Sequence, residues 1–345
     1  MRIPLPVPLI REMDAVIISG AGGYSTRAEF IVDAIQERIL ELTIEGVEDA
    51  GPPPVHEDDV SAAPGPPEEK AAHRRPTDSG TPVTMEMTEL VPRGAGFSIS
   101  PDDNLSRPEG KALFGLHNRD YPSLWALSQL AELAKEEPIP VVDYHAQVLK
   151  RAWDYGEHLL SLEEHTGRKC TALFPTNPDK RKSAEARFCM FAIGDFRING
   201  DKTVPTSGPL FEWRAAGLIG SVDQPRIGLT EAGWRLLAAL DGLSVDEPHT
   251  PASVAAFLTH LTEHARADLR GFVEILRAIG PEGATRQVVL DHAGTQWPEW
   301  NENEVSTNAA GYIARAREWG LVEPKQTKSH YHLTPLGVEH LPGGK

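Results

Sequence analysis

The stretch Arg315-Ala316-Arg317-Glu318-Trp319-Gly320-Leu321-Val322 decides how the second half of this 345-residue chain is read, because an earlier stretch repeats its pattern. The earlier stretch is Glu212-Trp213-Arg214-Ala215-Ala216-Gly217-Leu218-Ile219. Each is followed, after roughly ten mostly polar residues, by Leu-Thr-x-x-Gly, at 229–233 and at 333–337. The shared pattern predicts a helix closed by glycine, a β-hairpin, and a helix capped by threonine.

The residues around these two stretches are predicted to be mostly helical, with short strands. Apolar side chains repeat at helical spacing from Leu124 to Ala134, and Pro138 ends that helix. Further helices are expected at 146–162 and 183–193, and either one long helix or two helices at 254–279. The pair Asn199-Gly200 predicts a turn. We therefore expect a mainly α fold for residues 111–345.

With helices expected at 284–292 and 303–319, the second copy resembles a winged helix, and the first copy ends in a similar unit. The resemblance implies that the helix at 303–319 and the wing at 323–333 contact DNA. Residues 305–332 hold four Lys/Arg and two Glu, so they are locally basic. The expected contacts are Thr307, Asn308, Arg315 and Arg317 on the helix surface, and Lys325 and Lys328 on the wing. Winged-helix units that bind proteins instead of DNA stay an alternative.

A second resemblance covers residues 2–43. A short apolar run and a helix precede Gly22-Gly23-Tyr24, and Ser25 and Thr26 can cap a following helix, with Glu29 completing a capping box. This order resembles a ribbon-helix-helix module, which implies a homodimer. The resemblance assigns the dimer core to Ile3, Leu5, Val7, Phe30, Ile31, Ile35 and Ile39. It assigns DNA contact to Arg2, Ser25, Thr26 and Arg27, while the prolines at 4, 6 and 8 have no N–H to donate.

Charge is the main argument against a DNA partner. The formal net charge is −16, whereas phosphate neutralisation usually supplies most of the affinity for nucleic acid. Residues 46–110 carry thirteen Asp/Glu against five Lys/Arg and eleven prolines, which predicts a disordered acidic linker. The acidic balance argues against unspecific coating of DNA but leaves room for a small contact surface. Lys180, Arg181 and Lys182 form the densest basic patch, either a phosphate contact or a solvated start of a helix.

Other chemistry has little support in the sequence. Cys170 and Cys189 are too few for a disulfide scaffold, which favours a cytoplasmic location. No metal-ligand spacing, nucleotide-binding loop or hydrolase motif is present, so no cofactor and no metal are expected. No apolar run is long enough to span a bilayer, and no signal peptide is expected.

The sequence thus predicts four segments: a dimerisation module at 1–45, a linker at 46–110, a helical domain at 111–250 and a second winged-helix-like domain at 251–345. The leading hypothesis is a homodimeric transcriptional regulator that binds double-stranded DNA and is not an enzyme. The alternative is a non-enzymatic interaction or scaffold subunit, for example in plasmid maintenance or phage defence, whose modules bind other proteins. The weakest hypothesis is that the chain is an enzyme with an unrecognised site at 111–250.

Overall fold

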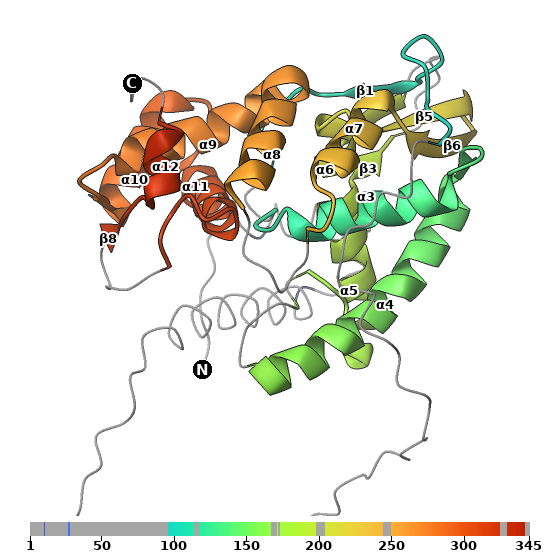
Figure 1. The fold of residues 1–345 in the computed structure, drawn as a ribbon, viewed down its shortest axis with the longest axis horizontal. Coiled ribbons are helices and arrows are strands. Elements are labelled where there is room, and N and C mark those ends of the chain that lie inside the picture. The colour runs from blue at the N-terminus through green and yellow to red at the C-terminus, as the bar shows by residue number, and fades with distance from the viewer. Residues whose placement is uncertain are drawn as a thin grey trace, which may run out of the picture.

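The computed structural model describes residues 96–113, 117–166, 171, 173–197, 204–243, 250–324 and 330–341, together with Ile10 and Arg27. These residues are mainly helical with short strands, as the sequence predicts (Figure 1). One hydrophobic core runs through them from Leu113 to Leu333. The predicted ribbon-helix-helix segment, apart from two single residues, and the linker up to residue 95 lie outside the described residues.

The first unit, residues 121–239, is built on a long helix and a three-stranded antiparallel sheet. Its sheet order is β2-β6-β5, in which Ile139 pairs with Ile227 and Leu218 pairs with Ile227 from the other side. The elements of this framework are α3 (Tyr121–Leu133), β2 (Ile139–Pro140), α4 (Val141–Thr166), α5 (Arg181–Phe188), η3 (Cys189–Ile193), α6 (Pro209–Glu212), β5 (Ala216–Ser221), β6 (Gln224–Leu229) and α7 (Glu231–Ala239). The short helix η2 (Pro178–Lys180) precedes α5.

A second small sheet interrupts the third helix of this unit. The π-helical turn η3 ends at Gly194, and the chain then forms β3 (Asp195–Phe196) and β4 (Val204–Ser207) before α6 begins. Strand β1 (Ser106–Pro108) pairs with β4 in parallel, which gives the order β1-β4-β3. Gly194 and Gly208 lie in direct backbone contact, with φ of 122° and 90°, and a Cβ added at Gly208 would be 2.2 Å from the Gly194 Cα. The chain therefore leaves the helix and returns to it at one place.

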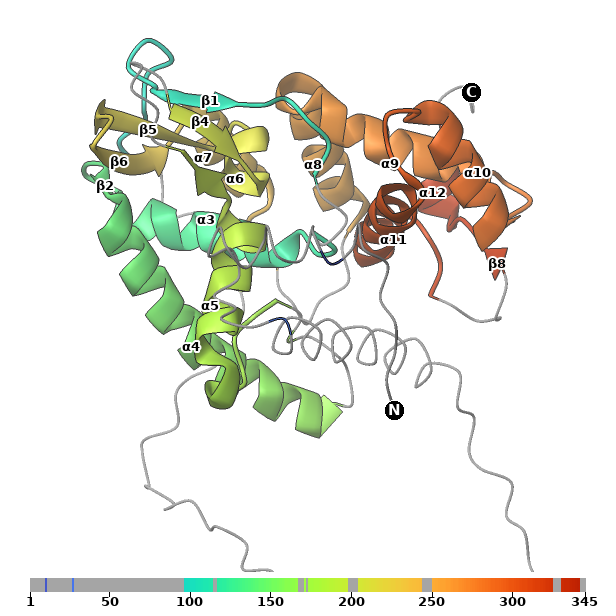
Figure 2. The ribbon, with the colours of Figure 1, turned by 180° about the vertical axis from the view of Figure 1, so that it is seen from behind.

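The second unit, residues 266–339, repeats the order of elements without that interruption. It contains α9 (Arg266–Ile279), β7 (Ala284–Thr285), α10 (Arg286–Gln296), α11 (Glu302–Glu318), β8 (His330–Tyr331) and α12 (Pro335–Glu339). Strands β7 and β8 are antiparallel, and Val322 bridges to Leu333. Helix α8 (Pro251–His264) lies between the two units in both ribbon views (Figures 1 and 2). Ala265 separates α8 from α9, so the segment at 254–279 forms two helices.

The two units end in the same hydrogen-bonding arrangement. The Thr230 hydroxyl donates to the Arg214 carbonyl over 2.6 Å and accepts from the Gly233 N–H. The Thr334 hydroxyl likewise donates to the Gly320 carbonyl over 2.6 Å and accepts from the Gly337 N–H. The predicted threonine-capped helices are therefore confirmed in both places.

The structure corrects the alignment of the two stretches. Arg214, not Gly217, is the counterpart of Gly320, because both follow a buried tryptophan and have a positive φ, 56° and 63°. Gly217 lies within β5. The sequence comparison paired two glycines, whereas the left-handed position at the end of the first helix is occupied by an arginine.

The predicted linker also ends earlier than residue 110. The Ile99 N–H donates to the Leu229 carbonyl over 2.8 Å, and the Ile99 side chain is buried. Ser106 is buried as well, in strand β1. Residues 96–110 therefore contact both sheets of the first unit, through Ile99 and through β1, although their proline and acidic content is typical of a linker.

Candidate nucleic-acid interface

Helix α11 is the longest helix of the second unit, and one of its faces is open to solvent. The Asn301 side chain accepts from the N–H groups of Asn303 and Glu304, and the Glu304 carboxylate returns to the Asn301 N–H, so a full capping box fixes its start. Its inner face packs into the core through Val305, Ala309, Tyr312 and Ala316. Asn303, Thr307 and Ala310 form an exposed row of small side chains along its outer face.

Two arginines from other elements lie beside this row. The Arg286 Nη2 donates to the Ser306 hydroxyl over 2.9 Å, and the Arg119 Nη1 donates to the Ala314 carbonyl over 3.3 Å. No ion pair joins either guanidinium to a carboxylate of the described residues, but the charge of Arg119 acts on Glu318, where it opposes the rise in pKa that burial causes. Ser306 and Ala314 are about 12 Å apart along the helix axis, given a rise of about 1.5 Å per residue. The outer face of α11 thus has one positive charge beside Ser306 and another beside Ala314, and neither forms an ion pair among the described residues.

The predicted surface position of Arg315 is wrong. Its side chain is only 1% exposed, and its Nη1 and Nη2 each donate to Asp268 over 2.7 Å. Its Nε donates to Asp120 over 2.8 Å, so the guanidinium bridges two buried carboxylates. Asn308, predicted on the same surface, is also buried. Arg317 is half-buried, with its guanidinium 5.4 Å from the centre of the Tyr331 ring, while Thr307 is exposed as predicted.

The reason for the error is the tertiary contact between the units. The Trp213 indole of the first unit donates to Asp268 of the second over 3.0 Å. The Trp319 indole of the second donates to Asp120, at the start of the first, over 2.7 Å. Burial alone would raise the pKa of Asp120, but Arg315 and His117 bring that pKa below its usual value. Helical periodicity marks which face is polar but does not show that a second unit covers it.

Equivalent glutamates of the two units hold the chain that joins β1 to α3. Glu212 accepts from the backbone N–H groups of Glu109 and Gly110, over 3.1 and 2.9 Å. Glu318 accepts from those of Asp120 and Tyr121, at the start of α3. Burial, together with the negative charge of Asp120, raises the pKa of Glu318 to about 7. Burial also raises the pKa of Glu212.

The remaining predicted contacts do not join this surface. Lys180 ends η2, and Arg181 and Lys182 begin α5 of the first unit. Arg181 pairs with Glu185 over 2.8 Å and lies 5.7 Å from the centre of the Trp153 ring, which fits the solvated-helix alternative. Arg27 is an exposed helical residue. The residues outside the described ranges are Arg2, Ser25, Thr26, Lys325, Lys328 and the seven predicted dimer contacts Ile3, Leu5, Val7, Phe30, Ile31, Ile35 and Ile39.

Sequence reasoning missed Arg119 and Arg286. Arg286 follows the capping residue Thr285 directly, so the start of a predicted helix was a usable signal for it. Arg119 meets α11 across 195 positions of sequence, and no local pattern predicts such a contact.

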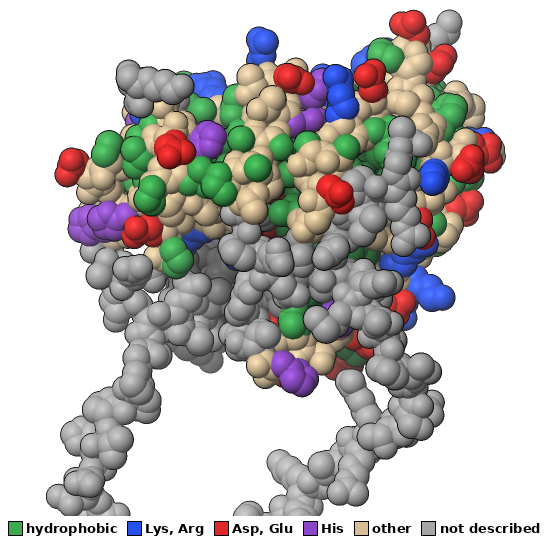
Figure 3. All heavy atoms as spheres, viewed as in Figure 1, with side chains coloured by type: hydrophobic (Ala, Val, Ile, Leu, Met, Phe, Trp, Pro, Cys, Tyr) green, Lys and Arg blue, Asp and Glu red, His purple; other side chains and the backbone are tan. Residues whose placement is uncertain are grey.

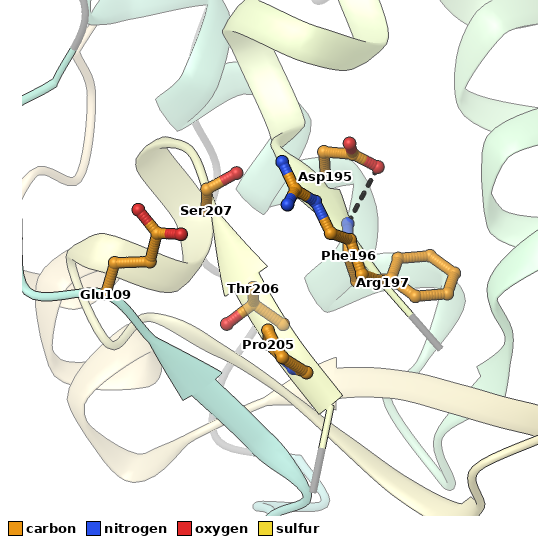
Figure 4. A pocket seen from close by; sticks show the side chains of 7 residues that line it. All are labelled: Glu109, Asp195, Phe196, Arg197, Pro205, Thr206 and Ser207. Carbon is orange, nitrogen blue, oxygen red and sulfur yellow. Dashed lines mark hydrogen bonds between the residues drawn. The ribbon is translucent and has the colours of Figure 1, made fainter. Parts of the chain in front are cut away.

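A shallow hollow lies between β1, β3 and β4. Figure 4 shows Glu109 on one side and Asp195 and Arg197 on the other, with Thr206 and Ser207 between them. Its volume of about 20 Å³ admits a water molecule but is far below that of a site for an organic substrate. Across the described ranges, no three His, Cys, Asp or Glu side chains gather as a metal site would need.

The space-filling view shows acidic and basic side chains interspersed on the face it presents (Figure 3). Among the described helices, none is long and apolar enough to cross a bilayer. A scan of the chain against models of protein families found no match, and searches of curated proteins and of solved structures found none either.

Proposed function

We propose that the chain is a DNA-binding transcriptional regulator that contacts the duplex through the outer face of α11. The order helix, strand, helix, helix, hairpin and closing helix occurs in both units and resembles that of winged-helix domains. The observation that carries the proposal is the exposed row of α11 with Arg119 and Arg286 beside it. Arg286 and Arg119 form no ion pair in the described part of a chain of net charge −16, and only Arg119 acts on a carboxylate nearby, that of Glu318. Their charges favour an anionic ligand at this face.

The side chains of the row suit a helix that enters the major groove. Thr307 and Ala310 are short, so a groove about 12 Å wide can approach the helix closely. Asn303 can reach base edges, while arginines that flank a helix bind phosphates and fix its orientation. Glu302 is exposed in the first turn, where its charge opposes DNA. We therefore place the contact along the middle of α11.

Homodimerisation through residues 1–45 is the second part of the proposal. Its support is the sequence pattern alone, namely the apolar faces around Leu5 and Ile35 and the capped second helix. The measurement is the mass in solution of the full chain and of a chain without residues 1–45. We expect the full chain to have the mass of two chains and the deleted form the mass of one shortened chain, and a shortened form that stays a dimer would place the contact elsewhere.

The α11 contact is tested with a short fluorescent duplex of mixed sequence, titrated at increasing salt. Thr307→Glu puts a negative charge in the middle of the row and should abolish binding, and Arg286→Gln should weaken it. Arg107→Gln is the control, since Arg107 is exposed on β1 and its Nη1 donates only to carbonyls near it in sequence. Binding by Thr307→Glu as tight as by the parent would exclude this face.

An interaction or scaffold subunit is the second candidate. The net charge of −16 and the burial of Arg315, which removes one predicted DNA contact, favour it. Salt separates the two, because the affinity of a phosphate contact falls steeply as salt rises. Duplex binding that is weak and insensitive to salt would make the scaffold role, such as one in plasmid maintenance or phage defence, the better proposal.

A further inference from the structure

The short segment before α3 leads directly into the first unit, yet it lies on the second. Arg119 is half-buried there, and its Nη1 donates to the carbonyls of Asn118 and Ala314. The next residue, Asp120, accepts from Arg315 and from Trp319. The start of α3 is therefore fixed against the C-terminal half of α11.

We propose that Arg119 is a phosphate-binding residue, so that the duplex-binding surface is composite and takes one of its two flanking cations from the other unit. This inference rests on the proposed DNA-binding function and adds a residue and a ligand group to it. The ligand group is a phosphate of the duplex backbone beside the C-terminal half of α11.

The contacts of Arg119 leave most of its donors available. A guanidinium has five N–H groups, and here only Nη1 forms hydrogen bonds with the residues that the structure describes, while the charge of the group also acts on Glu318. Nε and Nη2 can form the paired, fork-like contact that arginine makes with phosphate. The bond to Ala314 holds the side chain along the helix, so less conformational entropy is lost on binding.

Asp120 holds the backbone beside Arg119 in place. Its carboxylate accepts from the Arg315 Nε over 2.8 Å and from the Trp319 Nε1 over 2.7 Å. Its N–H donates to Glu318, which also accepts from the Tyr121 N–H. These bonds come from the last turns of α11 and from the residue after it, so Arg119 keeps its position relative to that helix.

The spacing favours a duplex over an acidic protein. Arg119 lies at Ala314 and Arg286 at Ser306, and short exposed side chains lie between them. A groove admits a helix between two regular rows of phosphates, which suits a helix with a cation near each end of an open face. Carboxylates on a protein surface have no such regular spacing.

The experiment measures duplex affinity and its dependence on salt in the full chain. The probe is the short fluorescent duplex of mixed sequence. Arg119→Gln keeps a side-chain amide that can donate to the Ala314 carbonyl but removes the charge. We expect a loss of affinity on the order of tenfold and a salt slope smaller by about one phosphate contact. Arg119→Lys should keep the slope, because it keeps the charge, while losing part of the affinity.

Arg107→Gln is the matched control, because it removes the same charge from an exposed arginine of β1 that also donates to two carbonyls. If Arg119→Gln binds like Arg107→Gln while Arg286→Gln is weakened, the inference fails and the proposed function stands. If the parent chain does not bind the duplex, both fail. If a poly-glutamate peptide displaces the duplex at equal charge concentration, the surface serves an acidic protein and the inference is overturned.

Discussion

The two units differ most in their third helix. In the second unit that helix is α11, 17 residues without a break. In the first unit, α5, η3 and α6 together are as long as α11, but β3 and β4 are inserted between η3 and α6. The insertion pairs with β1 and builds a second sheet. One copy of this architecture therefore accommodates an inserted sheet within its third helix, while the other copy keeps that helix unbroken, with one face exposed.

The units also differ in the side chains that they contribute to the contact between them. The tryptophan contacts are reciprocal, Trp213 to Asp268 and Trp319 to Asp120, as in the interface of a symmetric dimer. Arg315 breaks this symmetry, because the position four residues before Trp213 is Pro209. One arginine of the second unit therefore binds the aspartates of both units.

The largest expected effect comes from removing that arginine. Arg315→Met keeps most of the side-chain volume but leaves Asp120 and Asp268 buried without their cation. We expect a loss of about 3–5 kcal/mol in the free energy of unfolding, measured by urea denaturation. Arg266→Met, at an exposed position of α9, is the control and should stay within about 0.5 kcal/mol of the parent. Equal midpoints for the two variants would show that the junction does not depend on Arg315.

The closing helices test whether the units are packed alike. A Cβ at Gly233 would lie 2.0 Å from the Ala215 carbonyl oxygen, and one at Gly337 would lie 2.0 Å from that of Leu321. Gly233→Ala and Gly337→Ala should each cost about 1–3 kcal/mol, because backbone must move to admit the methyl group. Gly294→Ala in α10 is the control, with its nearest atom 4.0 Å away, and should gain about 0.5–1 kcal/mol from helix propensity. A large difference in unfolding free energy between Gly233→Ala and Gly337→Ala would show that the closing helices of the two units are not packed alike.

The sequence predicted what is encoded locally. The helices around 124–134 and 303–319, the hairpin before Leu229 and the threonine caps at 230 and 334 follow from periodicity and capping chemistry, and all are present. Arg315 was misplaced because the pattern shows a polar position on a helix but not the two aspartates that another part of the chain brings to it. The same limit hid Arg119. Residues 96–110 were assigned to the linker because of their composition. Their defined structure comes from the pairing of β1 with β4, which composition does not predict.

A smaller effect separates Glu318 from its counterpart Glu212. Burial and Asp120 raise the pKa of Glu318 from 4.5 to about 7, so the folded state binds a proton that the unfolded state has released between these values. Stability from this group is therefore fully present below about pH 4.5 and is lost as the pH rises toward about 7. Burial lowers the pKa of His260 to about 4, which acts in the opposite direction.

The Glu318 contribution is isolated by the difference between the parent and Glu318→Gln. We expect the free energy of unfolding of the parent to fall, relative to that of the variant, as the pH rises from about 4.5 to about 7. The matched variant is Glu212→Gln. Burial also raises the pKa of Glu212 in the parent chain, but no neighbouring aspartate contributes to that rise. A pH-independent difference between Glu318→Gln and the parent would show that Glu318 stays ionised throughout.

The smallest expected effect lies at the left-handed position that ends the third helix of each unit. Arg214 has φ of 56° and Gly320 has φ of 63°, and only glycine adopts this region without steric cost. Arg214→Gly should therefore raise stability by up to about 1 kcal/mol, and Gly320→Arg should lower it by a similar amount. No atom lies within 4 Å of a Cβ at Gly320, so the cost of the reverse change is conformational and not a clash.

Urea denaturation of both single variants and of the double swap measures the change in unfolding free energy at the two positions. Opposite shifts that nearly cancel in the double swap would show that the two positions are equivalent. A loss in both single variants would mean that Arg214 makes a contact worth more than its backbone strain, and the two helix ends would then be alike in geometry but not in energy.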